Sequence, residues 1–376
     1  MAMQLEGVRG ALGWRTLSGV LAYLIVLLLA AAASFNGYYD KWGFRDGEVR
    51  FSAELMLDGQ AERPFVFRRL NPWITNAIAE ATPDSLKSAV QVYAQSPEPG
   101  KSDLGPPYYL NAEHDAFWRY NVLYYLTFAE WFAALVVLAQ LCARYAGLAA
   151  GAAASILFAL MFPLFLSQGG YFYDFPEILF FSMAVYTAAR GWVIPLAAIV
   201  AVGTLNKETM LFFAPTLLPF LAANMGAVRG VAATAGLSVL AGGIYLLIRN
   251  YYAGNAGASA EFHLLNNIEY YLNPLHLFEM EKTYGLLLFR AYSVVGVAFV
   301  ILLAAAGWRI APKTVRGHVV LTLMVNLPLF AVLAYRAEMR NLSLTFVGWT
   351  LLVACALGAW IFDPSNARPR ILSERR

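Results

Sequence analysis

Residues 17–34 read LSGVLAYLIVLLLAAAAS and contain no charged side chain. The hydrocarbon core of a bilayer is about 30 Å thick, and roughly 20 apolar residues in an α-helix cross it. We therefore expect this stretch to form a membrane-spanning helix. A cleaved signal peptide is the alternative, because Arg9 and Arg15 precede the stretch and small residues end it. The apolar core is longer than the roughly 7–15 residues of a signal peptide, which favours an uncleaved span.

The composition of the whole chain agrees with this expectation. Of its 376 residues, 60% are hydrophobic and 14% are charged, and the mean hydropathy is +0.55. Soluble domains contain about 45–50% apolar and about 25% charged residues. The composition therefore predicts an all-α polytopic membrane protein in contact with membrane lipids. The net charge of +3 is too small to indicate a nucleic-acid partner, and Cys142 and Cys355 lie in apolar runs, where they are expected to pack as small hydrophobic residues.

Ten apolar runs, bounded by charged residues or by Gly and Pro, are candidates for transmembrane helices. They cover approximately 15–34, 118–141, 147–166, 175–189, 191–205, 209–224, 230–248, 285–307, 318–335 and 342–362. The fourth and fifth runs are short, as is typical of tilted or broken spans. We expect about 10 transmembrane helices in a single transmembrane module that comprises residues 1–376.

The distribution of positive charge predicts the orientation of these helices. If the N-terminus is cytoplasmic, the cytoplasmic segments carry twelve basic and three acidic residues, whereas segment 35–117 on the opposite side carries eight basic and twelve acidic residues. Cytoplasmic loops of membrane proteins are enriched in Lys and Arg. Both termini are therefore predicted to be cytoplasmic. The spans are rich in Ala, Leu and Gly, and we expect them to lie in a bacterial inner membrane.

Two segments on the extracytoplasmic side are longer than a connection requires. They comprise residues 35–117 and 250–283. Long loops in compact proteins are usually functional. The first contains amphipathic stretches at 65–78 and 85–93, which predict short helices along the membrane surface. A Pro- and Gly-rich link follows them at 96–107.

Ionisable residues gather at the extracytoplasmic ends of the predicted spans. A charged side chain close to hydrocarbon is costly, and such residues often have a function. The cytoplasmic turns, in contrast, hold isolated arginines that topology explains. We therefore expect an active site on the extracytoplasmic side. The residues that gather there are Asp40, Asp46, Glu48, His114, Asp115, Tyr173, Asp174, Glu177, Asn206, Lys207, Glu208, Arg336, Glu338 and Arg340.

Several of these residues belong to an ordered series of short motifs. Asp46 follows the first span, and the turn Pro64-Phe-Val-Phe-Arg-Arg-Leu-Asn-Pro72 comes after it. Further along stand Tyr173-Asp174-Phe175-Pro176-Glu177, Leu205-Asn206-Lys207-Glu208-Thr209 and Glu338-Met339-Arg340. The series covers most of the chain and resembles the motifs of type C glycosyltransferases (the GT-C superfamily), which use polyprenyl-phosphate sugars.

The resemblance implies a helical membrane module with an extracytoplasmic active site and a catalytic acid in the first external segment. The sequence departs from the family in one respect, because no Asp-Asp or Asp-x-Asp pair follows the first span and Asp46-x-Glu48 is the nearest match. Asp40 and Asp46 therefore compete for the catalytic role. A divalent metal cofactor stays an open possibility, with unknown ligands.

The chemistry of sugar transfer from a lipid phosphate suggests a role for each residue type. A carboxylate must take the acceptor proton, and cations must neutralise the leaving phosphate. We predict Asp46 as the base, with Asp40 and Glu48 as further catalytic candidates. Arg and Lys bind phosphate, so the phosphate candidates are Lys207, Arg340, Arg68, Arg69 and Arg336. The candidates for substrate binding are Tyr173, Asp174, Glu177, Glu208, Glu338, His114 and Asp115.

These residues also have structural interpretations. Cations at span ends often extend towards lipid headgroups. Lys207 with Glu208, and Glu338 with Arg340, would serve equally as structural ion pairs. Asp174 stands where a helix is expected to begin, and a carboxylate there stabilises the first turn.

The predicted function is therefore that of an integral membrane glycosyltransferase, a hexosyl- or pentosyltransferase. It would move a sugar from a polyprenyl-phosphate-linked donor to a lipid, glycan or protein acceptor. The alternative is a secondary transporter or lipid flippase for a lipid-linked or anionic substrate. Transporters usually contain paired repeats with broken helices, whereas this chain has no evident repeat and gathers its charges at one rim, which favours the enzyme.

Overall fold

The computed structural model describes residues 2–95 and 112–361, which are mostly α-helical. Within these described residues, six helices are long and apolar enough to cross a membrane. They are α1 (Ala2–Trp42), α5 (His114–Ala146), α6 (Leu148–Phe165), α11 (Ala227–Tyr251), α14 (Lys313–Leu333) and α15 (Ser343–Ile361). Apolar side chains such as Leu29, Val239 and Leu302 are more than half exposed, which suits contact with lipid. The protein is therefore an integral membrane protein.

Shorter apolar helices lie at the remaining predicted runs. They are α7 (Asp174–Ala188), α8 (Val193–Asn206), α9 (Thr209–Phe213), η3 (Ala214–Leu217), α10 (Leu218–Met225) and α13 (Val294–Trp308). The segments α9, η3 and α10 follow one another without a gap and together correspond to the single run predicted at 209–224. Every one of the ten predicted runs therefore contains helix.

Two boundaries differ from those expected. Helix α1 continues to Trp42 rather than ending near residue 34, so Asp40 lies within its last turns and not in a loop. The run predicted at 285–307 begins too early, because Leu286–Phe289 is a strand, β2, paired antiparallel with β1 (Met280–Thr283). Helix α13 begins only at Val294, where the Ser293 hydroxyl accepts a hydrogen bond from the amide of Gly296 at 3.0 Å. Apolar residues alone do not distinguish a strand from a helix over such a short stretch.

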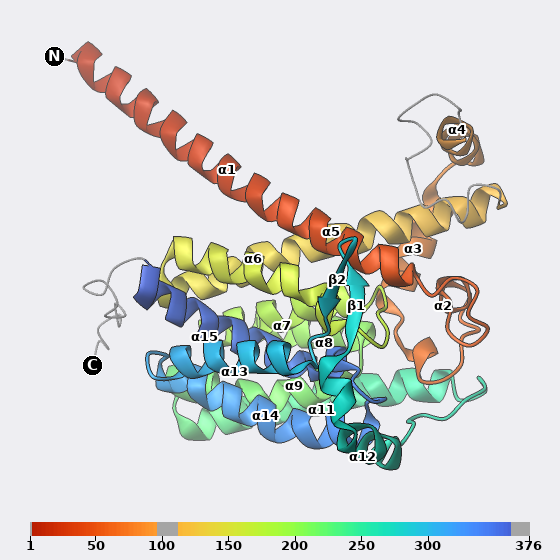
Figure 1. Ribbon diagram of the computed structural model, residues 1–376. Helices are drawn as coiled ribbons and strands as arrows, with labels where there is room; N and C mark the ends of the chain where they lie inside the picture. The colour runs from red at the N-terminus through yellow and green to blue at the C-terminus, as the bar shows by residue number, and fades with distance from the viewer. Residues whose placement is uncertain (1, 96–111, 362–376) are drawn as a thin grey trace.

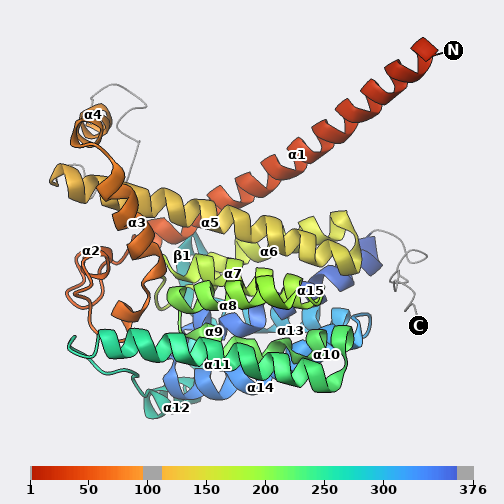
Figure 2. The same ribbon diagram turned by 180° about the vertical axis from the view of Figure 1, so that it is seen from behind.

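The long helices lie side by side in one bundle, and the connections are concentrated at one end of it (Figure 1). The start of α1 and the end of α15 lie at the opposite end, and the N-terminal half of α1 points away from the other helices in both views (Figure 2). The end with the connections carries α2 (Ala53–Leu57), η1 (Phe65–Phe67), α3 (Leu70–Ala81), α4 (Asp84–Ala94), α12 (Leu264–Leu272), η4 (Pro274–Phe278) and η5 (Met339–Leu342). The amphipathic stretches predicted at 65–78 and 85–93 correspond to η1 with α3, and to α4; the link at 96–107 lies outside the described residues.

Aromatic side chains fill the core between α1, α5, α6 and α7. Trp131 is fully buried and stacks on Phe162 with ring centroids 4.8 Å apart. Its indole Nε1 donates a hydrogen bond to the hydroxyl of Ser34 at 2.7 Å, which joins α5 to α1. Phe175, at the start of α7, contacts Trp131, Phe162 and Phe35. This packing sets the position of α7, whose first turn forms the base of the site described below.

Helices α5 and α6 approach closely because α6 carries Gly151 at their contact. A Cβ atom at this position would lie 2.5 Å from the carbonyl oxygen of Ala139. We expect Gly151→Ala to destabilise the fold by about 1–3 kcal/mol, because the backbones would have to separate. Thermal unfolding in detergent checks this.

Gly236 on α11 provides the matched control, because a Cβ atom there would meet nothing within 4 Å. Gly236→Ala should leave the midpoint unchanged or raise it, since Ala favours helix by about 1 kcal/mol over Gly. Equal midpoints for the two variants would contradict the close contact.

Candidate functional site

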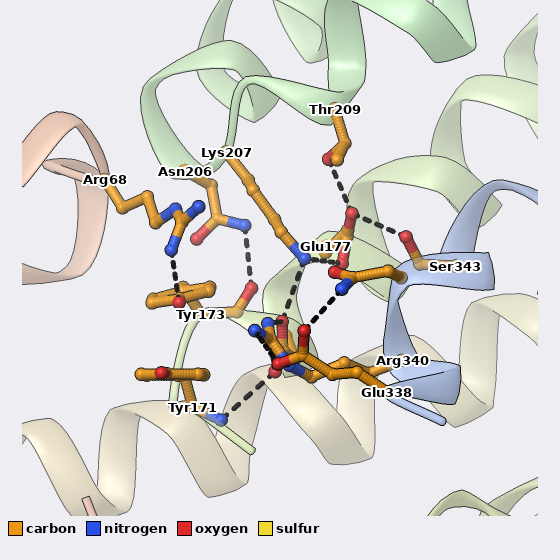
Figure 3. Close-up of polar contacts among 12 residues, drawn as sticks. Arg68, Tyr171, Tyr173, Glu177, Asn206, Lys207, Thr209, Glu338, Arg340 and Ser343 are labelled. Atoms are coloured by element: carbon orange, nitrogen blue, oxygen red, sulfur yellow. Dashed lines mark hydrogen bonds and ion pairs between the residues drawn. The ribbon is translucent and has the colours of Figure 1, made fainter. Parts of the chain in front are cut away.

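Four chain segments meet at the end of the bundle that carries the connections, and each contributes charged side chains. They are the end of η1, the start of α7 with the residues before it, the turn between α8 and α9, and the start of η5 (Figure 3). Residues that are up to 166 positions apart in the sequence bond to one another there. The members of this polar cluster are Arg68, Tyr173, Asp174, Glu177, Lys207, Glu208, Glu338 and Arg340.

Lys207 lies at the centre of this cluster. It follows α8 in an extended conformation, and its Nζ lies 2.9 Å from Asp174 Oδ1 and 2.7 Å from Glu177 Oε2. All three residues are buried. Both carboxylates stand in the first turn of α7, where the helix dipole also favours negative charge. A buried cation with two carboxylates is stable only while each charge keeps its partners.

The two carboxylates extend the cluster to the start of α15. Glu177 Oε1 accepts hydrogen bonds from the hydroxyls of Thr209 at 2.5 Å and Ser343 at 2.8 Å. Asp174 Oδ1 lies 3.3 Å from Arg340 Nη1. Arg340 in turn donates from Nη2 to Glu338 Oε1 at 2.6 Å. The start of α7, the turn after α8 and η5 are thus held by one network.

Arg68 and Glu208 form a second ion pair beside it. The guanidinium donates from Nη2 to Glu208 Oε1 at 2.6 Å and from Nε to Oε2 at 3.3 Å, and its Nη1 bonds the hydroxyl of Tyr173. Burial opposes ionisation of Glu208, but the neighbouring Arg68 charge outweighs it and lowers the pKa of the carboxyl. Glu208 is therefore ionised and engaged by Arg68 at neutral pH.

Two stacked tyrosine rings lie against the guanidinium groups of the cluster. Tyr171 and Tyr173 stack with centroids 5.0 Å apart and planes 14° from parallel. Figure 3 shows the two rings one above the other. Arg340 lies over Tyr171 at 4.5 Å, and Arg68 lies over Tyr173 at 4.3 Å. A guanidinium over an aromatic face gains a favourable interaction without needing a carboxylate.

A cavity of about 580 Å³ opens next to this cluster, within the roughly 300–1,000 Å³ usual for small-molecule sites. Cations and carboxylates line one part of it: Arg45, Arg50, Arg68, Lys207, Arg340, Glu208, Glu261 and Glu338. Helices α9, α11, α14 and α15 also contribute apolar and aromatic lining residues: Phe212, Tyr245, Leu329, Leu333 and Leu344. Such a cavity suits a ligand with a charged head and an apolar tail.

The structure brings together eight of the residues singled out in the sequence. Arg68, Lys207, Glu208, Glu338 and Arg340 line the cavity. Three further residues do not line the cavity but bond directly to its cations: Tyr173 to Arg68, and Asp174 and Glu177 to Lys207.

The three catalytic candidates of the first segment lie elsewhere. Asp46 is outside the cavity lining, and its Oδ2 accepts a hydrogen bond from the hydroxyl of Tyr120 at 2.7 Å. Burial raises the pKa of the Asp46 carboxyl, although the bonds from Tyr120 and from the Phe44 amide oppose the shift. Asp40 is exposed on α1 and accepts from Asn36 at 2.8 Å, and Glu48 is exposed.

The remaining four candidates have structural contacts away from the cavity. Arg69 donates to the carbonyl of Met56, and Arg336 is exposed beside Tyr335. His114 bonds Gln91, and Asp115 accepts from Lys87 at 2.7 Å. These last two contacts attach α4 to the start of α5. Among the described residues, no group of three or more His, Cys, Asp and Glu side chains is placed to hold a metal ion.

The sequence analysis did not single out three charged residues that line the cavity. Arg45 precedes Asp46, and Arg50 and Glu261 come from the two long segments 35–117 and 250–283. Arg50 Nη2 bonds Glu261 Oε1 at 2.7 Å across 211 positions. Nothing local in the sequence indicates this contact, because the partner lies in a different segment.

Comparisons with protein-family models, curated proteins and solved structures find no match to this chain. Function therefore has to be inferred from the side chains themselves.

The buried position of Lys207 leads to a prediction about stability. We expect Lys207→Met to destabilise the protein by about 3–5 kcal/mol, because it leaves two buried carboxylates without their cation. Thermal unfolding of the purified protein in detergent measures this.

Lys87→Met is the control of identical chemistry. The carboxylate partners of Lys87, Asp84 and Asp115, are 94% and 52% exposed, so water replaces the lost cation. A Lys207→Met variant as stable as wild type would contradict the structural role of the central ion pair.

Proposed function

We propose that the protein is an integral membrane glycosyltransferase that moves a sugar from a polyprenyl-phosphate donor to an extracytoplasmic acceptor. The cavity is the observation that carries this proposal. Its charged and polar lining residues offer cations for a phosphate and hydrogen-bonding groups for a sugar, and its apolar lining residues come from helices of the bundle. A polyprenyl-phosphate sugar has the matching charged, polar and apolar parts. The ordered motifs that resemble type C glycosyltransferases support the same conclusion.

The proposal includes the topology. The chain would cross a bacterial inner membrane about ten times, with both termini in the cytoplasm and residues 35–117 and 250–283 outside. The excess of positive charge in the segments assigned to the cytoplasm supports this orientation. The cavity would then face the extracytoplasmic side, where lipid-linked donors rather than nucleotide sugars are used.

In this reaction the acceptor hydroxyl loses its proton to a base while its oxygen bonds the anomeric carbon. The bond from that carbon to the phosphate oxygen breaks, and the phosphate leaves with the electron pair. Cations beside the phosphate stabilise the developing charge. The chain must therefore place a base and a cation at opposite sides of one sugar-sized space.

Glu261 is best placed among the cavity carboxylates to be the base. Glu208 is bound through both oxygens by Arg68, and both oxygens of Glu338 accept hydrogen bonds. Glu261 is held through Oε1 by Arg50, while Oε2 has His263 Nε2 at 3.5 Å and accepts no hydrogen bond from the described residues. The carboxylate of Asp46 would have to turn away from Tyr120 to act on a substrate in the cavity.

The proposed activity is tested with the purified protein in lipid nanodiscs. Undecaprenyl-phosphate hexose and pentose donors are incubated with cell-envelope extract as acceptor, and released undecaprenyl phosphate is measured. We expect release that depends on the protein. Proteoliposomes that carry the donor intact across the bilayer, with no release, would show a transporter or flippase instead.

The identity of the base is tested by single-turnover transfer in two conservative variants. Glu261→Gln should lower the rate by about 10²-fold or more while donor binding is kept, because it removes the proton acceptor. Asp46→Asn should have a smaller effect, since its carboxyl lies outside the cavity lining. The reverse order would return the base to Asp46.

A further inference from the structure

Among the residues that the structure describes, five Arg and Lys side chains line the cavity, and four of them have carboxylate partners. Arg50 pairs with Glu62 and Glu261, Arg68 with Glu208, Lys207 with Asp174 and Glu177, and Arg340 with Asp174 and Glu338. In each case the positive charge is already balanced by the protein. A ligand that binds these groups would have to compete with a fixed carboxylate.

Arg45 is the exception. Within the described residues, no carboxylate oxygen lies within 4.0 Å of its guanidinium nitrogens, and its buried Nε has no hydrogen-bond partner. An unpaired cation at a poorly hydrated position costs free energy, which a bound anion would recover. Arg45 is therefore able to donate hydrogen bonds to a negatively charged ligand.

Aromatic rings hold the guanidinium of Arg45 in place. Its Cζ lies 4.6 Å from the ring centre of Trp42, 5.0 Å from that of Tyr171 and 5.7 Å from that of Phe51. These contacts orient the group without hydrogen-bonding its Nη atoms. A preorganised Arg loses little side-chain freedom when it binds an anion.

The backbone around Arg45 also favours this position of its guanidinium. Arg45 itself has a positive φ of 61°, which is uncommon for a residue with a side chain. Across the contact, Gly169 leaves room for the guanidinium, because a Cβ atom there would lie 2.5 Å from Arg45 Nη2. The neighbouring Asp46 turns towards Tyr120, so the two adjacent side chains diverge.

We propose that Arg45 is the group that binds a substrate phosphate in this cavity. A guanidinium forms two parallel hydrogen bonds to a phosphate, and among the described residues the other four cavity cations are each paired with a carboxylate. The apolar side chains Phe212, Leu329 and Leu333 in the same cavity favour a lipid phosphate over a free one. The inference rests on the proposed function, and it assigns the phosphate to Arg45 instead of Lys207 or Arg340.

The test measures equilibrium binding to wild type and to Arg45→Gln in nanodiscs of neutral phosphatidylcholine. The probes are undecaprenyl phosphate, inorganic phosphate and, as a ligand without charge, undecaprenol. We expect Arg45→Gln to weaken binding of undecaprenyl phosphate by at least about tenfold and to leave undecaprenol unaffected. Arg45→Lys should restore part of the affinity, because it keeps the charge but not the paired hydrogen bonds.

Arg190→Gln is the matched control. Arg190 also lies against two aromatic rings, Tyr186 at 4.6 Å and Trp192 at 4.8 Å, but it does not line the cavity. The affinity of the Arg190→Gln variant for undecaprenyl phosphate should equal that of wild type. If Arg45→Gln unfolds, Arg45→Lys provides the second variant, because it keeps the charge but not the paired hydrogen bonds.

Each outcome decides the inference. A loss of inorganic phosphate binding in Arg45→Gln, with undecaprenyl phosphate unchanged, would support an anion site for free phosphate. Unchanged affinity for both phosphate probes in a folded Arg45 variant would overturn the assignment, while donor release by that variant would leave the glycosyltransferase proposal intact. A wild-type protein that binds neither phosphate probe would overturn the assignment and the proposed function together.

Discussion

The contact of Lys207 with Asp174 and Glu177 is the interaction on which the rest of the site depends. It places an ammonium and two carboxylates in a buried position, at 2.9 and 2.7 Å. Because each of these groups is costly without the others, the start of α7 and the turn between α8 and α9 cannot move apart independently. Arg340 and Ser343 connect η5 and α15 to the same carboxylates. One network therefore fixes one wall of the cavity.

The charged residues around the cavity therefore differ in role. The most deeply buried cations are engaged in holding the fold, and their positions are set by partners from other segments. Arg45 and Glu261 differ, because aromatic rings orient the first and a single arginine holds the second. Each retains atoms that accept or donate no hydrogen bond among the described residues. A substrate would meet an already rigid wall and two groups with unused bonding capacity.

Much of the fold was predictable, because membrane helices are specified locally. An apolar run in lipid must satisfy its own backbone hydrogen bonds, so helix follows from composition and length. The structure has helix at all ten predicted runs. The local sequence did not predict the structure where contacts with other segments decide the conformation. Leu286–Phe289 is as apolar as a span, but it pairs with Met280–Thr283 as a strand. Helix α1 continues past its apolar part as far as Trp42 because its last turns pack on α5 and α6.

The sequence by itself determined that this chain forms a bundle of apolar helices with charged residues at their ends. It also identified Arg68, Lys207, Glu208, Glu338 and Arg340, which the fold gathers around one cavity. The pair of Glu338 with Arg340 is local in the sequence, but only the tertiary structure decided that Arg68 pairs with Glu208 and Lys207 with Asp174, 140 and 33 positions away. It also decided that Arg45 lines the cavity while Asp46 faces Tyr120. Adjacent residues in a tight turn can point in opposite directions, and that choice depends on packing partners that no local pattern encodes.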